Sequence, residues 1–154
     1  KSFHHGLSKE DRGCNFHSMS SRNPDRKRLF LIDGYAMLYR CHFALIRNPL
    51  ITSYGLHTSA LYGFTNQTLK LIESESPDYI GAIFDTKEKT FRHEYYPSYK
   101  ATREKMPEEL QIQLPYLWRI LKGLNVFYTS TPGFEADDIV GTVVKNAEKE
   151  NMDT

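Results

Sequence analysis

The sequence has little cysteine and no long apolar segment. Its two cysteines, Cys14 and Cys41, match no metal-binding or redox spacing, so a reducing compartment is expected and a disulfide framework is not. No apolar run approaches the ~20 residues of a membrane-spanning helix, and the N-terminus lacks the apolar core of a signal peptide. We therefore expect a soluble, cytoplasmic protein without a membrane partner.

The sequence also lacks a charge excess, because 20 Lys and Arg residues against 19 Asp and Glu residues give a formal net charge of +1. This near-zero net charge excludes no class of partner, since the charges of an acidic pocket and of a basic binding surface would cancel in the total. The 154 residues, 40% of them hydrophobic, suffice for one domain with a hydrophobic core. Residues 1–25 are polar and aperiodic. We interpret them as a disordered leader or non-native extension before an ordered domain over residues 26–154.

Three carboxylates occur within four residues, at Glu135, Asp137 and Asp138. A short strand is predicted before them over residues 125–129, and an apolar stripe with helical spacing follows them, so the acids lie on a strand-to-helix loop. Acids at a helix start cap free N–H groups and complement the macrodipole. One cap needs only one acid, however, and a divalent cation with oxygen ligands relieves the repulsion among three acids better.

Two further acids follow apolar runs of the kind found in buried parallel strands. Residues 28–32 precede Asp33, and residues 79–84 precede Asp85. The carboxyl ends of parallel strands meet at one edge of a sheet, where such folds bind ligands. Each acid alone fits a turn or a cap, but five acids that follow three strands together favour a metal site.

Helical patterns connect the predicted strands over residues 35–44, 58–74 and 107–124. Gly63 is expected to permit close packing of the second helix, and Pro115 is expected to kink the third. Strands that alternate with helices in this order predict a parallel sheet between helical layers. The expected fold class is therefore a three-layer, Rossmann-like α/β fold.

The segment over residues 86–107 interleaves cations with aromatic rings. Its basic residues are Lys87, Lys89, Arg92, Lys100, Arg103 and Lys105, and its aromatic residues are Phe91, Tyr95, Tyr96 and Tyr99. Such a mixture suits a nucleic-acid strand, because cations bind phosphates and rings stack on bases. Composition alone fits a solvated loop with locally packed rings equally well. The segment leaves directly from Asp85, over the acidic edge, and this position favours nucleic-acid binding.

Several motifs, in order, make the chain resemble a known family. They are Leu31-Ile32-Asp33-Gly34 with Tyr39-Arg40, Tyr62-Gly63-Phe64, Phe84-Asp85-Thr86-Lys87, Phe91-Arg92-His93-Glu94, Tyr99-Lys100-Ala101 with Arg103, Met106-Pro107-Glu108, and Gly133-Phe134-Glu135-Ala136-Asp137-Asp138. From about residue 28 to residue 154, the chain is similar to the N-terminal part of the 5'-3' exonuclease (5' nuclease) domain of bacterial DNA polymerase I. This domain is related to flap endonucleases and PIN-like nucleases.

The resemblance implies roles for individual residues. The resemblance implies a Mg²⁺ or Mn²⁺ site, which holds two ions in the complete domain. The carboxylates of this site correspond to Asp33, Asp85, Glu135, Asp137 and Asp138. The catalytic residues that contact the scissile phosphate and the 5' strand correspond to Lys100 and Arg103. Arg92 corresponds to a further phosphate contact, and Tyr99 corresponds to a base-stacking ring. The segment over residues 86–107 corresponds to an arch, through or beneath which the 5' end of the DNA passes.

The resemblance also implies a substrate and a setting. The expected partner is DNA with a free 5' end or 5' flap, or an RNA primer on DNA, in replication and repair in the bacterial cytoplasm. The family continues past the position of Thr154 with another strand, further metal-site aspartates and a helix-hairpin-helix region. We therefore expect a PIN-like domain truncated at its C-terminal end and catalytically incomplete alone, followed in the full-length protein by the rest of the nuclease domain and a polymerase.

Two other functions fit parts of the pattern. A phosphoryl-transfer or receiver-type domain also gathers acids at the carboxyl edge of a parallel sheet, but the chain has no Asp-x-Asp after its first predicted strand. A non-catalytic nucleic-acid-binding remnant of a nuclease needs only the basic, aromatic segment, so this alternative stays open.

Overall fold

A three-stranded parallel sheet forms the centre of the computed structural model, which describes residues 25–154. The leader expected over residues 1–25 lies outside the described residues, apart from its last residue. The strands are β1 (Leu29–Asp33), β2 (Tyr79–Ile83) and β3 (Phe127–Thr129), in the spatial order β1-β2-β3. Leu29 pairs with Tyr79 at the start of β1, and Gly81 pairs with Phe127 at the start of β3. All three carboxyl ends therefore lie at one edge.

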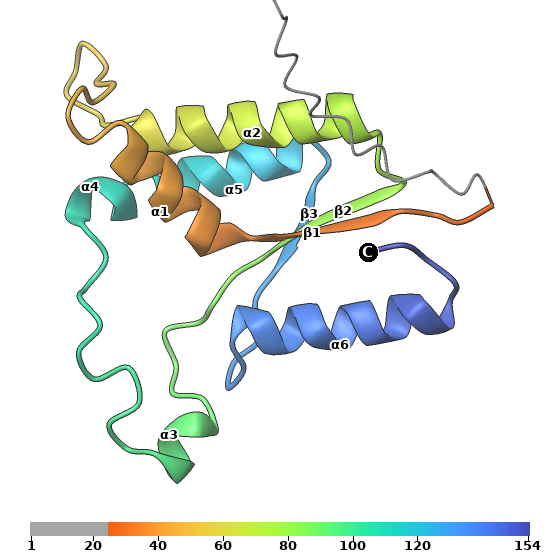
Figure 1. Ribbon diagram of the computed structural model, residues 1–154. Coiled ribbons are helices and arrows are strands. Elements are labelled where there is room, and N and C mark those ends of the chain that lie inside the picture. The colour runs from red at the N-terminus through yellow and green to blue at the C-terminus, as the bar shows by residue number, and fades with distance from the viewer. Residues whose placement is uncertain (1–24) are drawn as a thin grey trace, which may run out of the picture.

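Helices cover both faces of this sheet, which confirms the three-layer α/β fold. The helices are α1 (Gly34–Ala44), α2 (Ser59–Glu75), α3 (Arg92–Tyr95), α4 (Glu108–Gln111), α5 (Leu114–Gly123) and α6 (Ala136–Lys149). Figure 1 shows α1, α2 and α5 on one side of the strands and α6 on the other. None of the helices within residues 25–154 has the length and apolar character needed to cross a membrane.

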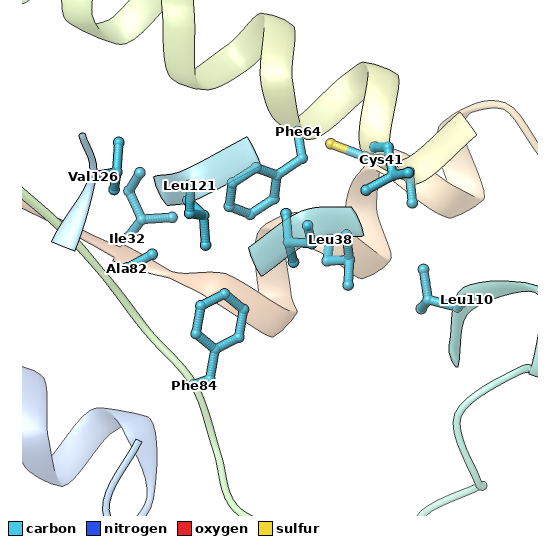
Figure 2. Packing of buried hydrophobic residues seen from close by; sticks show 12 residues of the cluster. Ile32, Leu38, Cys41, Phe64, Ala82, Phe84, Leu110, Leu121 and Val126 are labelled. Carbon is cyan, nitrogen blue, oxygen red and sulfur yellow. The ribbon is translucent and has the colours of Figure 1, made fainter. Parts of the chain in front are cut away.

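The hydrophobic core lies between the sheet and the layer of α1, α2 and α5. Ile32 and Ala82 extend from the strands into this layer and join a cluster that includes Leu38, Phe64 and Leu121 (Figure 2). The side chains of Leu38, Phe64 and Leu121 are fully buried, and burial of each contributes about 1.5–3 kcal/mol. The core therefore fixes the orientation of the strands whose ends carry the acids.

Two glycines bring the elements of this layer close together. A Cβ atom on Gly63 would lie 2.8 Å from the Cβ atom of Cys41, so α2 approaches α1 at a distance that a larger side chain would prevent. This confirms the close packing expected at Gly63. A Cβ atom on Gly34 would overlap the ring of Phe84, which follows β2. The start of α1 therefore packs directly on the end of the central strand.

The helix expected over residues 107–124 is divided into α4 and α5, so the kink expected at Pro115 within one helix is wrong. Pro115 lies in the first turn of α5, where its missing N–H group loses no hydrogen bond. Gln113 separates the two helices. Its fully buried side chain accepts a hydrogen bond from the backbone N–H of Leu61 at 3.2 Å and donates one to the carbonyl of Glu109 at 2.6 Å.

The chain returns to the sheet after α6. The backbone N–H of Leu29 donates to the carbonyl of Asp153 at 2.8 Å, and the N–H of Asp153 donates to the carbonyl of Lys27 at 2.8 Å. These bonds form a parallel bridge on the side of β1 that faces away from β2. The layer of α6 is thereby tied to the sheet at both ends of the helix, since Asp85 binds its N-terminus, as described next.

Candidate functional site

Two of the predicted acids occupy the carboxyl ends of neighbouring strands. Asp33 ends β1 and caps α1, because its Oδ1 atom accepts a hydrogen bond from the backbone N–H of Ala36 at 2.9 Å. Asp85 follows β2, and its Oδ1 atom accepts a hydrogen bond from the backbone N–H of Ala136 at 2.7 Å. The second bond spans 51 residues of sequence and joins the end of β2 to the start of α6.

The remaining three acids occupy the start of α6. Glu135 is the N-cap residue and is 8% exposed. Asp138 accepts a hydrogen bond at Oδ2 from the backbone N–H of Glu135, at 3.0 Å, in a capping box. Asp137 is exposed to solvent. The capping interpretation is therefore correct for Glu135 and Asp138, which form the capping box, and it does not account for Asp137.

Arg92, at the start of α3, reaches the acids of α6. Its two terminal nitrogens donate to the two carboxylate oxygens of Asp138, each at 2.6 Å, and one of them lies 4.0 Å from Glu135. This is the paired geometry in which a guanidinium binds a carboxylate most strongly. Figure 1 shows how this becomes possible, because the chain runs from β2 past the start of α6 to α3 and then returns to α4.

The later part of the arch contacts the same acids. The Nζ atom of Lys100 lies 3.1 Å from Oε1 of Glu135, and the hydroxyl of Tyr99 donates to Oε2 of Glu135 at 3.2 Å. Arg103 lies 3.5 Å from Oδ2 of Asp85. All four residues expected to contact DNA are therefore brought to the acid cluster, and three of the five expected metal ligands are their partners. Asp33 and Asp137 take no part in these contacts.

The ion pair between Arg92 and Asp138 alters the proton affinity of both groups. The hydrogen bonds from Arg92, with a smaller effect from the backbone N–H of Glu135, lower the pKa of Asp138 from 3.8 to about 2. The pKa of Arg92 is raised in turn, chiefly by its hydrogen bonds to Asp138. Tyr35 belongs to the same edge, and burial raises the pKa of its phenol, with the charge of Asp85 adding to the effect. Asp138 is thus held in its charged form.

Carboxylate oxygens are the donors that hard divalent cations prefer, and this donor set suits such an ion. Lys100 and Arg103 already bring positive charge to Glu135 and Asp85, so the position accepts cations. In the arrangement described for residues 25–154, however, no three His, Cys, Asp or Glu side chains come close enough together to hold a metal ion. The arch cations are the counter-ions of the acids in this state.

Other residues of the arch hold it together and were not expected from the sequence. The ring of His93 contacts the ring of Tyr99 edge-on, with centroids 5.5 Å apart. The Nδ1 atom of His93 lies 3.1 Å from the backbone nitrogen of Thr90. Phe91 contacts Phe134, with ring centroids 6.2 Å apart, and so joins the arch to the loop before α6. The sequence carried no signal for these contacts beyond the aromatic content of the arch.

The fold is similar to that of a 5' nuclease from a bacteriophage. The structure of the bacteriophage T5 flap endonuclease in a pseudo-enzyme-product complex with DNA and metal ions superposes with a TM-score of 0.51. The match has 21% sequence identity and covers 77% of this chain and 44% of that chain. The chain therefore has a PIN-like fold.

Residues 28–154 match the family model of the 5'-3' exonuclease, N-terminal resolvase-like domain, and the chain belongs to this family. The chain is 40% identical over 126 residues to DNA polymerase I of Caldicellulosiruptor bescii, with 82% of this chain and 15% of that protein covered. It is 39% identical over 130 residues to DNA polymerase I of Bacillus subtilis, with 84% and 14% covered. The chain thus spans about one seventh of the length of these relatives.

The ion pair between Arg92 and Asp138 predicts how the pKa of Asp138 changes when Arg92 is replaced. Arg92→Gln should raise the pKa of Asp138 from about 2 toward 3.8, because the largest cause of the shift is removed. A carboxylate with a lowered pKa stabilises the fold above its unfolded pKa and loses that contribution as the pH falls. Acid unfolding of the parent should therefore steepen between pH 4 and pH 2, and that of the variant should not.

The measurement is a carboxyl-carbon NMR titration of the metal-free protein. Arg103→Gln is the matched control, because Arg103 belongs to the same arch but pairs with Asp85. An Asp138 pKa that stays near 2 in Arg92→Gln would contradict the assigned cause.

Proposed function

We propose that this chain forms part of a divalent-metal-dependent 5'-3' exonuclease or 5' flap endonuclease domain that hydrolyses phosphodiester bonds in DNA. The observation that carries the proposal is the direct contact of arch cations with the acids at the carboxyl edge of the sheet. A 5' nuclease needs metal-binding acids and phosphate-binding cations within one short distance of each other. Membership of the 5'-3' exonuclease family supports the proposal, and leaves no support for a receiver-type domain.

The metal, Mg²⁺ or Mn²⁺, would take its ligands from among the five carboxylates expected from the sequence. Asp33, Asp85, Glu135 and Asp137 are the first candidates, because both oxygens of Asp138 are paired with Arg92. When bound, the metal supplies an activated water for attack on the phosphorus and offsets negative charge on the leaving oxygen. The complex of the T5 flap endonuclease with DNA and metal ions supports this choice of partners. The acid edge of the sheet provides hard oxygen donors for it.

The arch residues then have two successive partners. Lys100 and Arg103 pair with Glu135 and Asp85. With a divalent cation held by these carboxylates, Lys100 and Arg103 would be available to bind the scissile phosphate and the 5' strand. Tyr99, beside Lys100, is the proposed stacking surface for a base. Positive charge from Lys100 would stabilise the transition state electrostatically.

A non-catalytic nucleic-acid binder is the second candidate. The observation that favours it is that no three potential metal-binding side chains meet within residues 25–154. Binding by the arch requires only its cations and rings, so this function survives even where a metal is bound weakly. Replication, repair and fusion to a polymerase, as in the DNA polymerase I relatives, are proposals that apply to both candidates.

Metal binding separates the two candidates. Asp85→Asn and Asp137→Asn should each weaken Mn²⁺ binding about ten-fold or more, because each removes one negative oxygen ligand from a site that depends on charge. The measurement is calorimetric titration of the parent and the variants. Glu73→Gln is the control, since Glu73 is exposed on α2, away from the acid edge. Equal affinity in the parent and both site variants would contradict the metal site.

DNA binding tests the arch. Lys100→Ala and Arg103→Ala should each weaken binding to a 5' single-stranded overhang and make the slope of log affinity against log salt shallower by about 0.7, as loss of one phosphate contact does. Fluorescence anisotropy at several salt concentrations measures both quantities. Lys122→Ala, an exposed change on α5, is the control. If the arch variants bind as tightly as the parent at low salt, the arch is only a solvated loop.

A further inference from the structure

The ion pair between Arg92 and Asp138 differs from the other arch contacts. It joins two nitrogens to two oxygens at 2.6 Å, whereas Lys100 and Arg103 each make one contact, at 3.1 and 3.5 Å. The side chains of Arg92 and Asp138 are 30% and 21% exposed, comparable to those of Lys100 and Glu135 at 33% and 10%, whereas that of Arg103 is 52% exposed. Paired geometry and partial burial both strengthen an ion pair. This contact is therefore the firmest link between the arch and α6.

Both oxygens of Asp138 are already used. The Oδ1 atom accepts from one nitrogen of Arg92, and the Oδ2 atom accepts from the other nitrogen and from the backbone N–H of Glu135. A metal ion on Asp138 would have to displace the guanidinium and weaken the cap of α6. Asp138 is thus committed to its protein partners.

The neighbouring acid is in the opposite situation. Asp137 is exposed, and its side chain forms no hydrogen bond or ion pair with any residue in the range 25–154. Its carboxylate can bind a metal ion without losing a protein contact. The two adjacent aspartates therefore have the same charge and nearly the same location, but only Asp137 is available to bind a metal ion without losing a protein contact.

The arch segment beyond Arg92 depends on where Arg92 is held. The guanidinium lies over the ring of Phe91, 4.7 Å from its centroid, and Phe91 contacts Phe134 beside the acid cluster. The N–H of Tyr96 then donates to the carbonyl of Arg92, and the N–H of Tyr99 donates to the carbonyl of Tyr96. A backbone path thus connects the fixed Arg92 to Tyr99, at the point where the arch contacts Glu135.

We propose that Arg92 and Asp138 are a pair of positioning residues that fixes the base of the arch to the start of α6, and that Asp138 is not a ligand of the divalent metal. The pair holds Tyr99 and Lys100 over the acid edge, where the metal and the phosphate are to meet. This inference rests on the proposed function for the identity of the metal site, but the pairing itself is independent of any metal.

The first test is hydrogen exchange of the arch amides in the metal-free chain. Arg92→Gln and Asp138→Asn should each accelerate exchange of the Tyr96 and Tyr99 amides about ten-fold, and the double variant should show no further loss. Asp137→Asn, which removes the same charge from the adjacent position, should change exchange less than two-fold. Arg92→Lys should recover part of the protection. Asparagine keeps an oxygen that can cap α6, so Asp138→Asn retains the helix.

The second test is calorimetric titration of the same proteins with Mn²⁺. Asp138→Asn should keep its affinity within about three-fold of the parent, whereas Asp137→Asn should lose about ten-fold. Equal losses in both variants, or arch exchange in Asp138→Asn that matches the parent, would overturn the inference. Failure of the parent to bind Mn²⁺ would overturn the proposed metal site instead, while the exchange rates would still decide whether Arg92 and Asp138 position the arch.

Discussion

Carboxylates that share one edge of a sheet repel one another, and this constraint governs the arrangement of the whole site. The parallel strands bring Asp85 to the start of α6, where Glu135 and Asp138 already lie. The arch supplies one cation for each of these acids, Arg103 for Asp85, Lys100 for Glu135 and Arg92 for Asp138. The basic, aromatic insert and the acid edge therefore stabilise each other in the absence of DNA, and the path of the arch follows from the positions of the acids.

The hydrophobic core sets those positions through residues that adjoin the acids in sequence. Phe84 packs edge-on against Trp118, with ring centroids 4.6 Å apart, and immediately precedes Asp85. Gly34 immediately follows Asp33, and its lack of a side chain leaves room for the ring of Phe84. A change in core packing at this point would move both acids. The packed parallel sheet beneath the acids agrees with the general rule that functional groups are held best by packed elements.

Much of the fold and part of the site could be predicted from the sequence. Apolar runs ending in Asp33 and Asp85 identified two strands, because buried parallel strands have a strong signal. The break beside Gln113 could not be predicted, since it depends on a hydrogen bond to Leu61, far away in sequence. Likewise, the acid motif indicated a helix cap or a metal site, but it did not indicate which of its acids serves the cap and which is available to a metal. That distinction depends on Arg92, a residue 46 positions away from Asp138.

We propose that the acid edge is a divalent-metal site and that the arch cations are the counter-ions of its acids before a metal binds. Paramagnetic broadening of the amide resonances by Mn²⁺ at substoichiometric concentration tests this claim most directly, because the effect depends steeply on distance from the ion. Resonances of residues 33–36, 85–86 and 133–138 should broaden first, and the side-chain signal of Lys100 should shift as it leaves Glu135. Uniform broadening over the chain, or a Lys100 signal that does not respond, would contradict it.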